Sequence, residues 1–404
     1  MKFGHVSAGA AGLLAAALFL SACGGGSSSS SNSAAPDSTT APDSSAAAPS
    51  SAATAPAAGS SLKETAAAKV AEFAAGPASY PGPTDAFDPG TGKAAVMACG
   101  FAAPVCAEQA TFAVEALTAM GWDAGQPFDG EFSPLVQAGF IDRAVQDGLD
   151  GVVLVSVDVN TIKASVDRAI EAGLIITCTM CVSGPDYAGK VLDVVVDWDI
   201  QGQMAAWAIL AENGEESKVV SFSDAAFAPP PLRAAGLEKA LMENCATCTY
   251  ELVQFATGSI SKPGPPEFNS LMSQKAVGDI TNVVAHYDGL GMAIAKTIVQ
   301  AGREDISIGG YDGSPDAIAA LLSDKPPYAF SVAEPYTYAE WAAADLMART
   351  KAGLPLWADF DNLPSTLIVR ANAQKYLDGL PAPSTMPAPE GDWQGVFKQI
   401  WGKS

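Results

Sequence analysis

The feature that most constrains the fold is a regular alternation of short apolar runs and amphipathic helical stretches that begins at Lys93. The runs 94–99 and 151–156 are continuous and apolar, and Asn160 can cap the helix that follows the second run. Apolar strands separated by helices indicate parallel sheets that helices cover on both faces. Because the pattern occurs in two blocks, it predicts an α/β fold with two doubly wound parallel-sheet lobes.

The predicted elements follow one another in order along both blocks. The expected strands are 94–99, 151–156, 174–177, 191–196, 218–222, 250–254, 280–285, 306–309, 328–332 and 366–369. Besides the helix capped by Asn160 and ended by Gly173, the expected helices are 108–120, 202–213, 231–243, 267–276, 290–300, 315–322 and 336–350. Ligands of such sheets bind beyond the carboxyl ends of the strands, so a cleft between facing lobes is the expected site.

The first 23 residues have the features of an export signal. Lys2 precedes the apolar run 8–19, which is too short to stay in a bilayer as a spanning helix. The segment ends in Leu-Ser-Ala-Cys23, which resembles the lipobox of bacterial lipoproteins. In that family the signal is cut before the cysteine, which is then acylated. The resemblance implies a lipid such as palmitate on Cys23 and a place on the extracytoplasmic face of the cell membrane. A plain signal peptide with a chance cysteine is the alternative.

Residues 24–60 are almost entirely Gly, Ser, Ala, Pro and Thr. Such a segment cannot bury enough apolar surface to offset the entropy lost on ordering it. The strand pattern starts only at Lys93, so we expect a flexible tether over 24–92. Without roughly the first 60 residues, about 340 remain, a length normal for two domains.

The charge balance excludes some partners. The net charge is −22 and there is no basic patch, which argues against binding to nucleic acid or to anionic lipid surfaces. We interpret the acidity as a source of solubility. After the signal, no apolar stretch is long and uncharged enough for a membrane helix, so attachment is expected through the lipid alone.

Six cysteines other than Cys23 form three close couples, Cys99 with Cys106, Cys178 with Cys181, and Cys245 with Cys248. Export to an oxidising compartment favours disulfides, and the spacing favours local bridges without fixing the pairing. The two histidines, His5 and His286, are too few for a zinc site unless four thiolates also take part. We expect structural disulfides, no metal and no cofactor.

Signatures of catalysis are weak. The sequence has no Gly-x-Ser-x-Gly motif and no phosphate-binding loop, and His286 is the one histidine beyond the signal. We therefore do not expect an enzyme. A lipid-anchored enzyme stays a weaker alternative because catalysis by carboxylates needs none of these motifs.

The segments 281–296 (TNVVAHYDGLGMAIAK) and 308–316 (IGGYDGSPD), taken together, resemble the type I periplasmic binding proteins. These are the solute-binding subunits of ribose and other sugar ABC importers. The resemblance runs from about 93 to 369 and implies two lobes joined by a three-crossing hinge. By that analogy the N-terminal lobe is 93–197 plus 335–362, and the C-terminal lobe is 198–334 plus 363–404.

The resemblance also implies a set of ligand-binding residues. Matched position by position, these are Asp312, Arg233, Tyr287, Glu334, Ser156 and Thr179. Asp312 follows a late strand, Arg233 begins the early helix of the second lobe, and Glu334 lies at a crossing. Charged, planar groups suit a polyol because charge-assisted hydrogen bonds give direction and specificity. Tyr287 can stack on an apolar ring face.

The first lobe departs from the family pattern. The segment 102–106 replaces a run of polar and aromatic residues, and Thr179-Met180 replaces an Asp-Arg pair. Several polar contacts are thus missing from this lobe. The ligand is then either not a simple pentose or is held mainly by the second lobe. Local disulfides among the cysteines near the strand ends, Cys99, Cys106, Cys178 and Cys181, are expected to shape the wall of the pocket.

From these features we expect the extracytoplasmic solute-binding subunit of an ABC importer. Its expected partners are a sugar or a ring-bearing polar solute, the permease subunits of the importer, and the membrane through the lipid anchor. The main alternative is a receptor lipoprotein that uses the same cleft to report its ligand to a signalling partner.

Overall fold

The computed structural model describes residues 61–224, 227–255, 265–323, 325, 327–380 and 387–403. The expected export signal, its Cys23 and the first part of the expected tether lie outside the described residues. Within the described ranges, no helix has both the length and the apolar character needed to cross a membrane.

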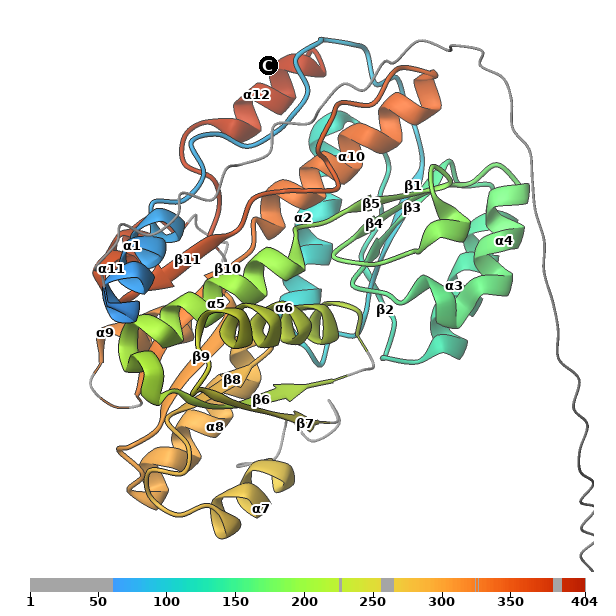
Figure 1. The fold of residues 1–404 in the computed structure, drawn as a ribbon. Helices are drawn as coiled ribbons and strands as arrows, with labels where there is room; N and C mark the ends of the chain where they lie inside the picture. Colours follow the sequence, from blue (N-terminus) through green and yellow to red (C-terminus); the bar gives the residue numbers. More distant parts are fainter. Residues whose placement is uncertain are drawn as a thin grey trace, which may run out of the picture. The chain divides into compact units, whose positions relative to one another are not determined.

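The first sheet has five parallel strands in the order β2-β1-β3-β4-β5. They are β1 (Ala94–Ala98), β2 (Phe128–Asp129), β3 (Gly151–Val155), β4 (Ile175–Thr179) and β5 (Val191–Val194). Helices α2 (Pro104–Met120) and α10 (Tyr336–Ala352) cover one face, and α3 (Pro134–Gln146) and α4 (Lys163–Glu171) cover the other (Figure 1). Successive strand residues alternate between the two cores, as a strand buried on both faces requires: Val153 packs with α2 and α10, and Leu154 packs with α3 and α4.

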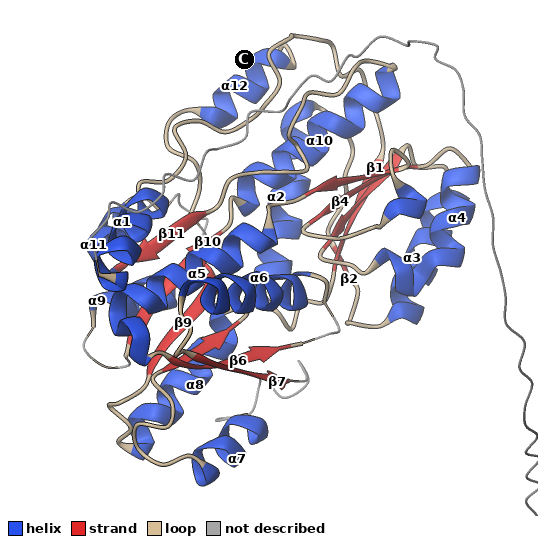
Figure 2. Ribbon diagram, viewed as in Figure 1, coloured by secondary structure: helices blue, strands red, loops and turns tan. Residues whose placement is uncertain are grey.

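The second sheet has six strands in the order β11-β10-β9-β8-β6-β7, all parallel except the antiparallel pair β10 and β11. They are β6 (Lys218–Ser223), β7 (Thr249–Gln254), β8 (Asn282–Ala285), β9 (Ser307–Asp312), β10 (Tyr328–Ala333) and β11 (Thr366–Val369). Helices α5 (Trp198–Asn213) and α6 (Pro229–Asn244) cover one face (Figure 2). The other face carries α7 (Pro266–Gln274), α8 (Asp288–Ala301), α9 (Pro315–Leu322) and α11 (Arg370–Asp378). The two doubly wound lobes confirm the predicted fold class.

The chain passes between the two sheets at three neighbouring places: from β5 to α5, from β10 to α10, and from α10 to β11. The first and third passages are paired, because Val196 and Leu363 form a bridge and the Leu363 N–H donates to the Val195 carbonyl at 2.8 Å. These three segments form the joint that the sequence predicts.

The second part of the expected tether differs from the prediction, because residues 62–74 form a helix, α1 (Leu62–Ala74). Ser61 caps it, and the Glu64 side chain accepts a bond from the Ser61 N–H in return, which satisfies donors that a helix start leaves free. The helix packs on α5 and β11 of the second lobe and buries Ala66 completely. The segment is rich in alanine, like the expected tether before it, but alanine is also the strongest helix former.

The chain then runs along the first lobe over 76–92. The Tyr338 hydroxyl donates to the Pro81 carbonyl at 2.7 Å, and the Trp122 indole donates to the Pro89 carbonyl at 3.2 Å. The N-terminal segment therefore connects α1 on the second lobe with β1 in the first.

The C-terminus also differs from the expected lobe boundary, which assigned 363–404 to the second lobe. Helix α12 (Trp393–Ile400) packs on α10 of the first lobe. Trp401, just after it, stacks on Trp341 with ring centroids 5.4 Å apart. The reason is an apolar stripe: Phe397, Ile400 and Trp401 are all buried against α10 and its neighbours.

Candidate functional site

A cavity of about 800 Å³ lies where the carboxyl ends of the two sheets face each other. Ser156 and Met180, which follow β3 and β4, line it from the first lobe. His286, Asp312 and Glu334, which end or follow β8, β9 and β10, line it from the second. The parallel strands place these side chains together because all of them end at the same edge of a sheet.

Five of the six expected site residues line this cavity, namely Asp312, Arg233, Tyr287, Glu334 and Ser156. Thr179 does not. It is fully buried, and its hydroxyl donates to the Leu154 carbonyl at 3.4 Å. The next residue, Met180, lines the cavity in its place.

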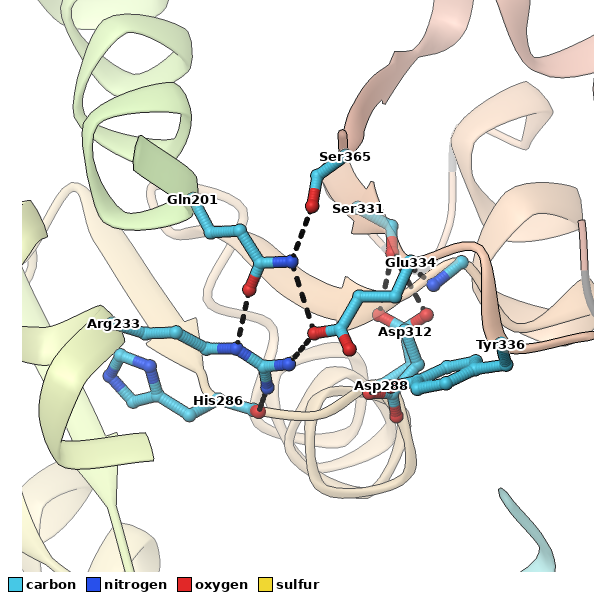
Figure 3. A network of polar contacts seen from close by, with 10 residues as sticks. Gln201, Arg233, His286, Asp288, Asp312, Ser331, Glu334, Tyr336 and Ser365 are labelled. Atoms are coloured by element: carbon cyan, nitrogen blue, oxygen red, sulfur yellow. Dashed lines mark hydrogen bonds and ion pairs between the residues drawn. The ribbon is translucent and has the colours of Figure 1, made fainter. Parts of the chain in front are cut away.

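Each nitrogen of the Arg233 guanidinium has a partner within the protein (Figure 3). Its Nε donates to Gln201 Oε1 at 2.8 Å, and its Nη1 donates to the His286 carbonyl at 2.6 Å. Its Nη2 forms an ion pair with Glu334. The guanidinium also lies over the Tyr311 ring, 4.7 Å from the centroid.

Gln201 is a member of the site that sequence reasoning missed. Its Nε2 donates to Glu334 Oε1 at 3.0 Å and to Ser365 Oγ at 2.7 Å, while its Oε1 accepts from Arg233 (Figure 3). It thereby ties α5 to two of the three crossing segments. Asp197 caps α5 and so places Gln201 in the first turns of that helix, but no motif marks Gln201 itself.

Asp312 ends β9 and is only 6% exposed. Its φ of 103° lies in a region that side chains other than glycine rarely adopt, a strain that proteins keep mainly at functional positions. The Tyr336 hydroxyl donates to its Oδ1 at 2.8 Å. The carboxylate is thus aimed into the cavity by the backbone turn and fixed there by a residue of the crossing.

Asp288, at the start of α8, holds the loop that follows Asp312. Its carboxylate accepts from the Ser314 N–H at 2.7 Å, from the Tyr328 hydroxyl at 2.9 Å and from the Ser331 hydroxyl at 2.9 Å. A side chain at Gly310 would begin 2.2 Å from Asp288 Oδ1, so the close approach requires glycine there. Asp288 therefore organises the loop after β9.

The two aspartates influence each other's ionisation. Burial and the nearby Asp312 carboxylate raise the pKa of Asp288 to about 7. Burial raises the pKa of Asp312 to about 6, against the opposing effect of Arg233. His286 behaves in the opposite sense, because burial and then the Arg233 charge lower its pKa to about 3 and keep the ring neutral.

The first-lobe wall is formed by the start of α2. Ala103, Pro104, Val105 and Cys106 line the cavity there, and a disulfide joins Cys106 to Cys99 at the end of β1. The other two disulfides are Cys178–Cys181 and Cys245–Cys248. The local pairing that the spacing favours is confirmed, and the first bridge belongs to the cavity wall as expected. The expectation was wrong for Cys178–Cys181, because both residues are buried in the core between the sheet and helices α3 and α4 and do not line the cavity.

The sequence of the two lobes matches a known domain. The profile of the periplasmic binding protein domain matches residues 95–353, more than half of the chain. The chain belongs to the periplasmic binding protein family. Among curated proteins, none matches it significantly.

Solved structures of ABC transporter solute-binding proteins share the fold of this periplasmic binding protein. One from Agrobacterium vitis, with bound allitol, has a TM-score of 0.64 at 17% identity and covers 72% of this chain and 99% of its own. The Caulobacter myo-inositol binding protein, bound to myo-inositol, has a TM-score of 0.64 at 16% identity, with coverages of 73% and 98%. The 5-methylthioribose transporter protein from Thermotoga lettingae has a TM-score of 0.62 at 15% identity, with coverages of 76% and 96%. The resemblance to type I binding proteins is confirmed.

Among the residues that the structure describes, no group of three or more His, Cys, Asp and Glu side chains is arranged to hold a metal ion. Asp312 and Glu334 bring carboxylate groups to the cavity that can accept hydrogen bonds.

Proposed function

We propose that this protein is the extracytoplasmic solute-binding subunit of an ABC importer and that it captures a sugar or a similar hydroxylated solute between its lobes. The observation that carries the proposal is the joint placement of Asp312, Glu334 and Arg233 in one cavity at the facing strand ends. The carboxylates can accept hydrogen bonds from hydroxyl groups, and charge-assisted bonds of this kind orient a small polar ligand.

Closure of the lobes is the proposed mechanism of capture. Phe132 of the first lobe and Phe227 of the second lie edge to face, with ring centroids 5.8 Å apart. The loops that carry these two residues are therefore in contact across the two lobes. A solute that contacts both lobes binds the closed arrangement better than an open one and shifts the population towards it. The closed form would then be recognised by the permease.

The relatives support a hydroxylated ligand. Allitol and myo-inositol are polyols, and 5-methylthioribose is a sugar derivative; each is bound by a protein of the same fold. The proposal also includes the lipid on Cys23, which would hold the protein on the extracytoplasmic face of the membrane, near its permease.

The test is a thermal-shift screen of the chain from residue 23 onward, with Cys23 replaced by Ser to prevent acylation, against sugars, polyols and their glycosides. A solute at 100 times its dissociation constant adds about 2.7 kcal/mol to the free energy of unfolding. We expect at least one hydroxylated solute to raise the melting temperature in a saturable way. A screen in which none does so would contradict the proposal.

A further inference from the structure

Two buried acceptor atoms of the residues that line the cavity lack hydrogen-bond donors. Glu334 Oε2 and Gln109 Oε1 are buried, and neither has a hydrogen-bond partner among the described residues. Both residues line the cavity, one from each lobe, and Asp312 lies there with them. Buried acceptors without partners are costly, so a ligand that donates hydrogen bonds to them has much to contribute.

The strongest donor group of the cavity, the Arg233 guanidinium, already makes three of its hydrogen bonds to protein groups. Each nitrogen of the Arg233 guanidinium has a partner, in Gln201, His286 and Glu334. Lys296 also lines the cavity, but it is exposed. The site therefore favours a donor-rich group over an anion, because the Arg233 charge is already paired with Glu334 and an anion would meet the open acceptors Glu334 Oε2 and Gln109 Oε1.

The cavity wall around the start of α2 is apolar, unlike the part of the cavity that Asp312 and Glu334 line. Ala103, Pro104, Val105 and the Cys99–Cys106 disulfide bring no side-chain donor or acceptor to the cavity. Met180 lines the same lobe, and Phe227 lines the cavity from the second lobe while packing against the first-lobe core. A ligand with hydroxyl groups on every side would bury some of them against this wall. Those hydroxyl groups would lose their hydrogen bonds to water and gain none from the protein.

From this division we infer that the ligand is a neutral hydroxylated molecule that carries an apolar substituent, with its hydroxyl groups on Asp312, Glu334 and Gln109 and its substituent on the wall at 103–106. The inference rests on the proposed function and specifies the class of solute. It differs from capture of a free sugar, which would leave the apolar wall unused.

The test compares matched pairs by isothermal titration: glucose, galactose, xylose and ribose, each against its phenyl and n-butyl β-glycosides. For at least one sugar we expect a glycoside to bind at least tenfold more tightly than the free sugar, which is about 1.4 kcal/mol. Free sugars that bind as tightly as their glycosides would overturn the inference and leave the proposed function intact. If neither free sugars nor glycosides bind, the proposed function fails as well.

A pair of variants tests the location of the substituent. Val105→Asn should lower the affinity for the glycoside at least fivefold more than the affinity for the free sugar. Val277→Asn is the matched control, because Val277 is 75% exposed and lies outside the cavity, and it should leave the ratio of the two affinities unchanged. Retention of the full preference in Val105→Asn would show that the wall does not hold the substituent.

Discussion

Arg233 and Glu334 form a buried ion pair that joins helix α6 of the second lobe to the crossing between β10 and α10. Their side chains are 4% and 0% exposed, so each charge depends on the other for compensation. Gln201 hydrogen-bonds to both partners and fixes their positions relative to α5. The pair thus belongs at once to the cavity and to the joint between the lobes.

Removing one partner of this ion pair should therefore destabilise the folded protein. We expect Glu334→Ala to lower the free energy of unfolding by about 3–5 kcal/mol, because the Arg233 charge would remain buried without compensation. Urea denaturation measures the change. Glu304→Ala is the control, since it breaks the exposed pair with Lys325 and should leave stability unchanged. Equal stability of the two variants would contradict the structural role of the pair.

The coupled aspartates predict a pH dependence of stability. Their pKa values, about 7 for Asp288 and about 6 for Asp312, exceed that of an unfolded aspartate near 4. The folded state therefore binds more protons between about pH 4 and pH 7, and the pair's contribution to stability falls as pH rises through this window. Above it the contribution is constant and at its lowest.

Asp312→Asn should relieve the repulsion that develops in this window. We expect the stability of the variant relative to the parent protein to be more favourable at pH 8 than at pH 5, as followed by melting temperature. Asp186→Asn, an exposed site outside the cavity, is the control. A stability difference that does not change with pH would show that the two carboxylates do not interact as proposed.

Much of the sheet architecture could be predicted from sequence because buried parallel strands are continuous apolar runs. The strand 366–369 coincides with β11, and 151–156 exceeds β3 by one residue. Helix α3 was not predicted. Its signals are present in the sequence, because Ser133 and Pro134 are sound start signals and its buried residues Gln137, Ile141 and Ala144 recur at helical spacing.

The site was predictable where a residue lies within a strand-end motif, as Asp312 does. Thr179 illustrates the limit: it was matched to a position of the family motif, but strand β4 turns its side chain into the core, and Met180 lines the cavity instead. Gln201 carries no motif, and its role depends on the crossings that bring α5 beside Glu334 and Ser365. Contacts of this kind arise from tertiary packing and leave no local signal.

Truncation tests where the folded part of the chain begins. A protein that starts at Ser61 keeps every described contact of α1, whereas one that starts at Lys93 loses the packing of α1 on α5. The shorter protein also loses the bonds that Pro81 and Pro89 accept from Tyr338 and Trp122. We expect it to be less stable by about 2 kcal/mol or more, because these donors and the apolar surface of α5 are left uncovered. Equal urea midpoints for the two proteins would contradict this account.

The disulfides predict a difference between two double variants. Cys99→Ser/Cys106→Ser should lower the free energy of unfolding by about 2–3 kcal/mol and also weaken solute binding, because the bridge holds the cavity wall. Cys245→Ser/Cys248→Ser opens a shorter loop that does not line the cavity. It should cost about 2 kcal/mol and leave the affinity unchanged. If both double variants lost the same amount of affinity for the solute, the Cys99–Cys106 bridge would have no specific effect on the cavity wall.

The most direct test of solute capture between the lobes is isothermal titration of the parent protein and Asp312→Ala with the solute that gives the largest thermal shift. The account predicts one site per chain and an affinity at least tenfold lower in Asp312→Ala, with an unchanged circular dichroism spectrum. Asp186→Ala, on the surface of the first lobe, should bind as the parent does. Unchanged affinity in Asp312→Ala would contradict the assignment of the interlobe cavity as the binding site.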